Sequence, residues 1–152
     1  MIIGSKDTAL LCTLHALENS TFNFYLTGSR FFGTERARSD WDFFTQESEE
    51  VEKFLLKNDF KLHNETKYSD SMTSKVYRYK NQIDVQLVTN TEKKLAIQRS
   101  FFLAGNVNPK KDEWNTAAHR YDNLHIDSKP FQNAAAGGSV VLSCGAYRVH
   151  QV

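Results

Sequence analysis

The sequence predicts an α+β fold, because helical and extended patterns mix along a chain of one-domain size. In some segments apolar residues recur every three or four positions, and in others aromatic or apolar residues alternate with polar ones. The 152 residues are enough for one domain with a substantial core. With 19 basic and 18 acidic residues the net charge is +1, so we expect no surface-wide basic field for DNA.

The first half of the chain is expected to contain two helices and two strands. An amphipathic helix comes first, and its apolar positions at helical spacing are Leu10, Leu11, Leu14 and Leu17. Strands follow at 21–27 (TFNFYLT) and 39–45 (SDWDFFT), where aromatic residues are frequent. A helix from about Ser48 to Asn58 completes this half, because its apolar residues fall on one face.

The next segments are typical of strands and then of a helix. Residues 60–65 (FKLHNE) suit a short strand. Residues 74–89 (SKVYRYKNQIDVQLVT) are typical of a hairpin that turns near Lys80-Asn81. Its basic and aromatic residues would also suit single-stranded RNA, although an ordinary amphipathic strand explains them equally well. A helix is then expected over 91–105 (TEKKLAIQRSFFLAG), with Gly105 at its end.

The last expected helix has the clearest sequence signals. Asn108 suits its cap and Pro109 its first position. The expected apolar face is Trp114, Ala117, Ala118, Tyr121 and Leu124. We expect residues 1–127 to form one domain and 128–152 to form a flexible linker and tail, whose end could be a small hairpin, disordered or a vector-derived extension.

Cysteine usage and the first apolar run indicate a cytoplasmic protein. Cys12 and Cys144 lie far apart and suggest no disulfide framework or metal-ligand spacing, so reduced thiols are expected. The run ALLCTLHAL is interrupted by His15 and lacks a small-residue cleavage site, so it is not expected to be a signal peptide. No apolar run approaches the length of a membrane span, and no membrane partner is expected.

Three aspartates form the strongest chemical signal. Because side chains alternate along a strand, Asp40 and Asp42 point to one face while Trp41 and Phe43 point to the other. Two adjacent carboxylates repel unless a cation lies between them, and Mg²⁺ or Mn²⁺ suits such an oxygen cluster. Asp84 lies opposite the apolar face of a later strand and would be the third carboxylate.

A turn and a set of arginines lie just before the acid pair. Gly28 can turn the backbone sharply and come close to a ligand, and exposed N–H groups with the Ser29 hydroxyl could hold a phosphate. Arg30, Arg36 and Arg38 lie between this turn and the acids, where they could neutralise phosphate charge. We expect Arg30 and Arg38 to help bind nucleotide, although a solvated loop also explains these arginines.

These motifs resemble the signature of the nucleotidyltransferase superfamily typified by DNA polymerase beta. Gly28-Ser29, ten further residues, Asp40-Trp41-Asp42-Phe43 and a later Asp84 are similar to that signature over roughly residues 22–89. In size the chain resembles minimal single-domain members, such as antitoxin-type or stand-alone phage and bacterial nucleotidyltransferases. The resemblance implies a mixed β-sheet flanked by helices, here with a C-terminal helical segment.

The same resemblance implies a reaction and its cofactor. Asp40, Asp42 and Asp84 would hold two Mg²⁺ or Mn²⁺ ions, and Gly28 and Ser29 would hold the triphosphate. A nucleoside monophosphate would move from an NTP, with ATP expected, to a hydroxyl on a protein, an RNA or a small molecule, releasing pyrophosphate. No matching residue indicates the base or the acceptor. Larger members carry a helical substrate domain for which we expect no room here, and only the helices after Thr89 could substitute for it, so the choice of substrate stays open.

Two other interpretations stay open. Asp40 could cap a local turn with Ser39, and Asp42 could lie on a solvated edge strand. The fold could also serve as a non-catalytic module that binds nucleotide or neutralises a partner protein, as antitoxins do. The small size and near-neutral charge favour such a module, whereas the complete set of three acids favours an enzyme.

Overall fold

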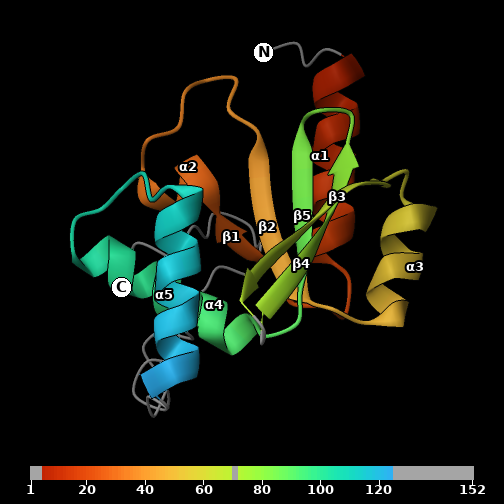
Figure 1. Ribbon diagram of the computed structural model, residues 1–152. Helices are drawn as coiled ribbons and strands as arrows, with labels where there is room; N and C mark the ends of the chain where they lie inside the picture. Colours follow the sequence, from red (N-terminus) through yellow and green to blue (C-terminus); the bar gives the residue numbers. More distant parts are fainter. Residues whose placement is uncertain (1–4, 70–71, 125–152) are drawn as a thin grey trace.

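A mixed five-stranded β-sheet organises the chain (Figure 1). The computed structural model describes residues 5–69 and 72–124. The strands are β1 (Tyr25–Thr27), β2 (Trp41–Gln46), β3 (Lys61–Ser69), β4 (Met72–Tyr79) and β5 (Ile83–Val88). Their order in the sheet is β1-β2-β5-β4-β3. Strands β2 and β5 are parallel and the other pairs are antiparallel, so the expected α+β class with a mixed sheet is confirmed.

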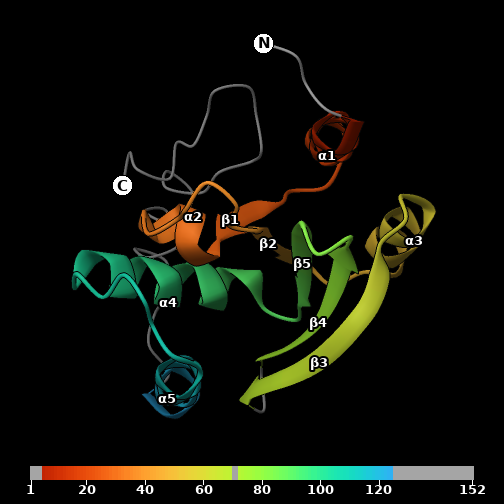
Figure 2. The same ribbon diagram turned by 90° about the horizontal axis from the view of Figure 1, so that it is seen from above.

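Helices cover both faces of this sheet. They are α1 (Ser5–Glu18), α2 (Gly28–Phe32), α3 (Glu49–Lys57), α4 (Thr91–Leu103) and α5 (Lys111–Leu124). Seen from above, α1 and α3 lie on one side of the sheet and α4 and α5 on the other (Figure 2). Successive side chains of β2 point to opposite faces of the sheet. Phe43 packs in the larger apolar cluster with α1 and α3, and Phe44 packs in the smaller one with α4 and α5.

The central strands and their hairpin match the sequence prediction. Strand β2 is buried at Phe43 and Phe44, and β5 is buried at its alternate apolar positions. Lys80 and Asn81 between β4 and β5 have φ values of 46° and 56°, the left-handed conformation that a tight turn requires. The Gln82 N–H closes this turn by donating to the Tyr79 carbonyl at 2.9 Å.

The helix predictions for α3 and α4 are confirmed, and each begins at a side-chain cap. The Ser48 hydroxyl accepts from the Val51 N–H at 3.1 Å, and the side-chain Oδ1 of Asn90 accepts from the Lys93 N–H at 3.1 Å. Gly105 follows α4 with φ +77°, as expected for a residue after a helix. Of the expected apolar face of α1, Leu14 and Leu17 are buried, whereas Leu11 is 42% exposed.

The first strand is shorter than predicted. Strand β1 begins at Tyr25 rather than Thr21. The cause is local, because the Ser20 hydroxyl donates to the Leu17 carbonyl at 2.7 Å and accepts from the Phe22 N–H at 3.3 Å. These bonds keep 20–22 in a turn after α1. Directly after β1 comes the short helix α2, which the sequence did not predict.

The last helix begins later than predicted. Helix α5 starts at Lys111, so Asn108 and Pro109 precede it and are not its cap and first residue. Glu113 caps it instead, because its carboxylate accepts from the Lys110 N–H at 3.0 Å. The expected linker and tail, 128–152, lie outside the described residues. Within 5–69 and 72–124, no helix is both long and apolar enough to cross a bilayer.

Candidate functional site

The turn that follows β1 at Gly28 lies directly against β2, the strand that carries Asp42. Thr27, the last residue of β1, pairs with Asp42 of β2. Gly28 follows with φ +70°, which L side chains rarely adopt. A β-carbon at residue 28 would lie 2.3 Å from Asp42 Oδ2. A side chain at residue 28 would therefore be strained by the backbone conformation and would displace the Asp42 carboxylate.

Helix α4 fixes the end of β1 from the other side. Gln98 of α4 is buried, and its amide nitrogen donates to the Leu26 carbonyl at 3.1 Å. Its amide oxygen accepts from the Thr27 hydroxyl. Because both bonds are buried, the strand end and the following turn have little freedom to move relative to α4.

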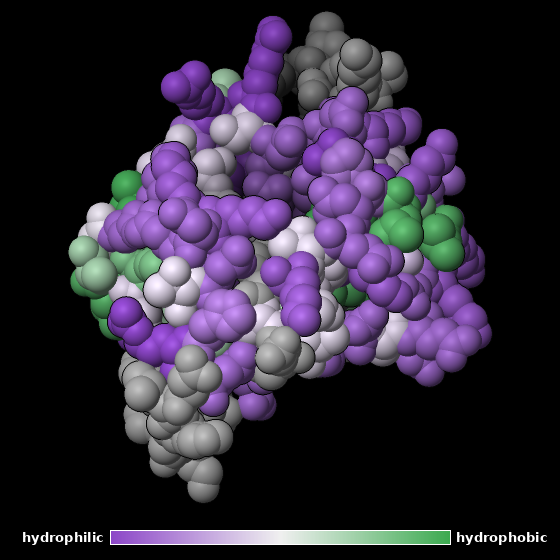
Figure 3. Space-filling view, in the orientation of Figure 1, coloured by the Kyte–Doolittle hydropathy of each residue, from purple (hydrophilic) through white to green (hydrophobic). Residues whose placement is uncertain are grey.

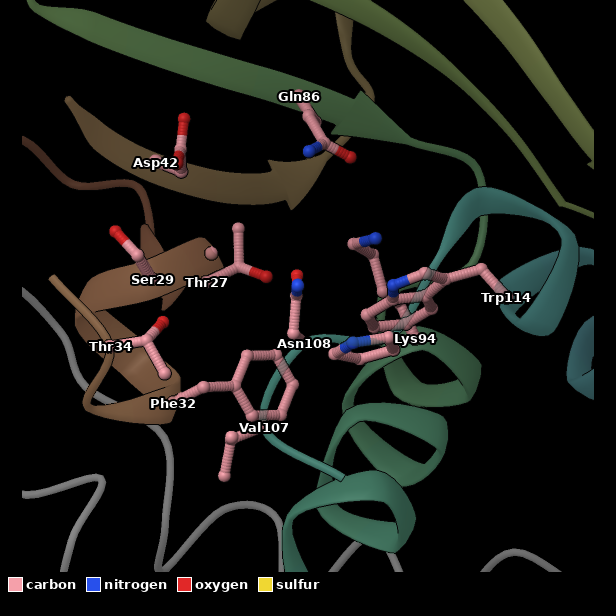
Figure 4. Close-up of a pocket in the computed structure, with 12 residues that line it drawn as sticks. Thr27, Ser29, Phe32, Thr34, Asp42, Gln86, Lys94, Val107, Asn108 and Trp114 are labelled. Atoms are coloured by element: carbon pink, nitrogen blue, oxygen red, sulfur yellow. The ribbon is translucent and has the colours of Figure 1, made fainter. Parts of the chain in front are cut away.

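A cavity of about 270 Å³ opens between this turn, the sheet and the segment that joins α4 to α5 (Figure 4). Figure 4 shows Asp42 and Ser29 at one end of the cavity and Lys94 and Trp114 at the other. Polar lining residues are Thr27, Ser29, Thr34, Asp42, Gln86, Lys94 and Asn108. Seen from the side of α4 and α5, the surface is mostly hydrophilic, with small apolar areas at its margins (Figure 3).

The predicted acids lie close together on the sheet. Asp42 and Asp84 are register partners on the parallel strands β2 and β5, and Asp40 is exposed just before β2. Burial, followed by the charges of Asp84 and Asp40, raises the pKa of Asp42 to about 6. The mutual repulsion expected from the sequence is therefore present at Asp42.

An arginine that the sequence analysis did not select pairs with the third acid. Arg78 of β4 faces Asp84 of β5, and its guanidinium donates through Nε to Oδ1 at 2.8 Å and through Nη2 to Oδ2 at 3.1 Å. This bidentate pair places a positive charge beside Asp84 and lowers the local negative charge. A three-residue turn, 80–82, places Arg78 opposite Asp84. The predicted turn at Lys80-Asn81 would instead have placed Arg78 opposite Ile83, so the sequence analysis did not give this contact.

The three acids do not form a metal site as they stand. Within the part of the chain that the structure describes, no group of three or more His, Cys, Asp or Glu side chains is arranged to hold a metal ion. The donor chemistry still suits a cation, since burial and then the charges of Asp84 and Asp40 raise the pKa of Asp42. Binding of Mg²⁺ or Mn²⁺ by Asp40, Asp42 and Asp84 therefore stays a prediction.

Arg30 holds the chain that leads into β2. Its guanidinium lies 4.1 Å from the centre of the Trp41 ring and donates to the Ser39 carbonyl at 2.8 Å and the Asp40 carbonyl at 3.3 Å. Arg38 is exposed in the loop between α2 and β2. Neither arginine lines the cavity, so their expected role in nucleotide binding stays a prediction. Ser39 forms the local turn that was considered for Asp40, because its hydroxyl accepts from the Arg36 N–H at 2.7 Å.

The sequence analysis also missed the far end of the cavity. Lys94 was placed in a helix with no assigned role, and Trp114 was expected to be a core residue. Lys94 is 2% exposed, and its Nζ lies 4.1 Å from the centre of the Trp114 ring. A signal was present, because Lys94 shares helical spacing with Ile97 and Phe101 and so falls on the apolar face of its helix.

The site thus joins the Gly28 turn, the Asp42 carboxylate and the buried Lys94 around one polar cavity, and Asp84 is the register partner of Asp42 on the neighbouring strand. Its function has to be inferred from this geometry and from the sequence motifs. No family model matches the chain, and no curated protein or solved structure matches it.

Proposed function

We propose that this chain is a metal-dependent nucleotidyltransferase of the DNA polymerase beta-like fold. It moves a nucleoside monophosphate from an NTP, with ATP the expected donor, to a hydroxyl on a protein, an RNA or a small molecule. The observation that carries the proposal is the contact between the Gly28 turn and Asp42, where a β-carbon would lie 2.3 Å from the carboxylate. A phosphate held by this turn would lie beside the acids that could hold its metal ion.

The arrangement of the sheet supports the same reading. In β2 and β5 the two inner acids are register partners, although they are distant in sequence. Burial and the other acids raise the pKa of Asp42, so a cation there would relieve an unfavourable arrangement. In this proposal Asp40 and Asp42 hold both metal ions and Asp84 holds the one nearer the acceptor.

The reaction is a displacement at phosphorus. The acceptor oxygen bonds to the α-phosphorus, and the bond from that phosphorus to the pyrophosphate oxygen breaks. The hydroxyl proton passes to a base or to solvent, and pyrophosphate takes the bonding electrons. Bound Mg²⁺ would supply charge neutralisation for the acceptor oxygen and the leaving group. The chain itself supplies the backbone of the Gly28 turn and the Ser29 hydroxyl, which would bind the phosphates. It also supplies the three acids, which would hold the metal ions.

A second function is favoured by one specific observation. The Arg78 guanidinium makes a bidentate pair with Asp84 and so partly substitutes for a cation. A protein that binds nucleotide, or neutralises a partner, without turnover would have no need to release Asp84 from this pair. The enzyme must release Arg78 from Asp84 when metal binds, whereas the module keeps the pair intact.

A labelling experiment separates the two functions. The protein is incubated with each of the four NTPs labelled at the α-phosphate, with Mg²⁺ or Mn²⁺ and a cell lysate as the source of acceptor. We expect one labelled acceptor with wild-type protein and none with Asp42→Ala. Asp112→Ala is the matched control, because Asp112 is an exposed acid on α5 outside this cavity, and it should label as wild type does.

The outcomes are distinct. Equal labelling with wild type and Asp42→Ala would show that Asp42 does not act in transfer, and the enzyme proposal would fail. Metal-dependent binding of NTP without any labelled acceptor would favour the non-catalytic module.

A further inference from the structure

Lys94 is a buried lysine whose side chain borders the cavity. It lies on α4 and is 2% exposed. Its Nζ lies 4.1 Å from the centre of the Trp114 ring and 5.4 Å from that of Phe44. Aromatic faces attract an ammonium group through their quadrupole. The side chain is therefore held at the end of the cavity opposite Ser29 and Asp42 (Figure 4).

The preceding lysine shows what a structural lysine looks like in this helix. Lys93 is also buried, with 5% exposure. Its Nζ donates to the Ser69 hydroxyl at 3.2 Å and forms an ion pair with Asp122 of α5. Lys93 thus ties α4 to α5 and β3. Lys94 instead lies against aromatic rings at the wall of a cavity.

Burial gives Lys94 an unusual charge state. It lowers the pKa of Lys94 to about 7, because the charged amine is separated from water. An anion that enters the cavity would stabilise the charged form and would gain a strong interaction in return. The acid among the lining residues, Asp42, lies at the opposite end of the cavity from Lys94 (Figure 4).

The rest of the lining fits phosphate oxygens. Hydroxyls of Ser29 and Thr34 and the amide of Asn108 can donate hydrogen bonds into the same space. The cavity, at about 270 Å³, is slightly smaller than the roughly 300–1,000 Å³ of pockets that enclose drug-sized ligands. It therefore suits the phosphate chain of a nucleotide better than the whole nucleotide.

We infer that Lys94 binds the terminal phosphate groups of a nucleoside triphosphate at the α4 end of this cavity. The inference rests on the proposed function, because it takes the triphosphate to run from the Gly28 turn toward α4. Trp114 positions the ammonium group, and Ser29 holds the phosphate chain at the other end. The same chemistry would also bind inorganic tripolyphosphate.

Calorimetric titration tests this role without relying on turnover. Sodium tripolyphosphate, a non-hydrolysable ATP analogue and adenosine are each titrated into the full chain, once with Mg²⁺ and once with a chelator. We expect Lys94→Met to weaken binding of both phosphate compounds by at least about tenfold, as for the loss of one charge-assisted hydrogen bond. Lys53→Met is the matched control, since Lys53 is a mostly exposed lysine on α3, across the sheet, and should bind as wild type does.

Each outcome decides the inference. An ATP analogue that binds wild type and Lys94→Met equally would overturn it while leaving the proposed transfer reaction intact. Loss of adenosine affinity instead of tripolyphosphate affinity would make this a base-binding site, and absence of tripolyphosphate binding to wild type in both conditions would also overturn it. Weaker binding of tripolyphosphate to Lys94→Met than to wild type, measured with the chelator present, would support it even if no transfer activity exists.

A second measurement covers the case in which Lys94→Met fails to fold. The chain has two tryptophans, Trp41 and Trp114, so Trp41→Phe leaves Trp114 as the single reporter. Because Nζ of Lys94 lies 4.1 Å from that ring, tripolyphosphate should change its fluorescence and adenosine should not. Unchanged fluorescence at saturating tripolyphosphate would contradict the inference.

Discussion

Gly28 combines a left-handed backbone conformation with a close neighbour, whereas the other glycines of the described residues, Gly33 and Gly105, have only the backbone conformation. The Gly28 φ of +70° disfavours any L side chain, and a β-carbon there would meet Asp42 Oδ2 at 2.3 Å. Gly33 has a similar φ of +81°, but nothing lies within 4 Å of the corresponding β-carbon position. A comparison of substitutions at Gly28 and Gly33 therefore distinguishes the cost of backbone strain from the cost of the steric contact with Asp42.

Substituting both glycines by alanine measures that difference. Gly33→Ala should lower the free energy of unfolding by about 1–2 kcal/mol, the cost of a left-handed alanine. Gly28→Ala should cost roughly 1–3 kcal/mol more, because an overpacked contact is added. Denaturant unfolding measures both values.

A double-mutant cycle identifies the partner. Adding Asp42→Ala removes the carboxylate, so part of the extra cost at residue 28 should disappear and the two changes should couple by at least ~0.5 kcal/mol. Equal costs at residues 28 and 33, or no coupling to residue 42, would show that the turn and the carboxylate do not touch.

At the residue scale, strand alternation was enough to predict the acids but not their neighbours. Asp42 and Asp84 could be selected because each interrupts an apolar alternation. Lys94 and Gln98 could not be given a role, because their surroundings come from β1, β2 and α5, which are remote in sequence. Such contacts depend on the tertiary arrangement, which local patterns do not encode.

At the scale of elements, an ion pair joins α5 to α4. Lys93 of α4 pairs with Asp122 of α5, and the side chains of these residues are 5% and 22% exposed. Helix α5 also carries Trp114, which closes the far end of the cavity. Weakening the ion pair should therefore disturb both stability and the cavity.

Asp122→Asn tests this link. We expect the free energy of unfolding to fall by roughly 1.5–3 kcal/mol, less than the ~3–5 kcal/mol for a fully buried pair, because Asp122 retains some exposure. Asp112→Asn on the same helix is the matched control and should change it by less than about 0.5 kcal/mol. Similar effects of the two substitutions in chemical denaturation would argue against the ion pair as a support for α5.

The elements themselves were predictable where caps and periodicity agreed. Helix α3 has a serine cap and one apolar face, and β2 alternates clearly, so both were predicted nearly residue by residue. The start of β1 and the start of α5 were misplaced, because side-chain bonds from Ser20 and Glu113 override the local propensities. Helix α2 was missed because its five residues are too few to show a period.

At the scale of the whole molecule, a near-neutral chain concentrates negative charge at one place on its sheet. The net charge is +1, yet burial and two acids raise the pKa of Asp42 from 3.8 to about 6. Between those pH values the folded state binds more protons than the unfolded state. The free energy of unfolding should therefore fall as the pH rises from about 3.8 to about 6. Above that range Asp42 is ionised in both states, and this loss of stability is complete.

A divalent ion bound at these acids should offset this loss of stability. The ion and the proton compete for the Asp42 carboxylate, so the effect should be larger at high pH. We expect millimolar Mg²⁺ to raise the melting temperature more at about pH 7.5 than at about pH 5, with a gain of about 1.4 kcal/mol at ten times its Kd. Asp42→Asn should melt slightly higher than wild type without metal at pH 7.5 and lose the response to Mg²⁺. Glu49 is an exposed acid on α3, so the control variant Glu49→Gln should keep the rise in melting temperature with Mg²⁺. Identical melting with and without Mg²⁺ at pH 7.5, also in the presence of each NTP, would rule out a metal site among these acids.

The bidentate pair between Arg78 and Asp84 has a consequence for how the chain assembles its acids. These residues are six positions apart, so their meeting closes a short loop that the hairpin turn forms by itself. Asp42 reaches Asp84 only when β2 and β5 pair in parallel, after α3 and two further strands have intervened. Non-local pairing of this kind is the slow part of sheet formation, because more chain entropy is lost before contacts are gained. The hairpin can thus neutralise Asp84 before Asp42 arrives, and the two carboxylates approach one another with a counter-charge already in place.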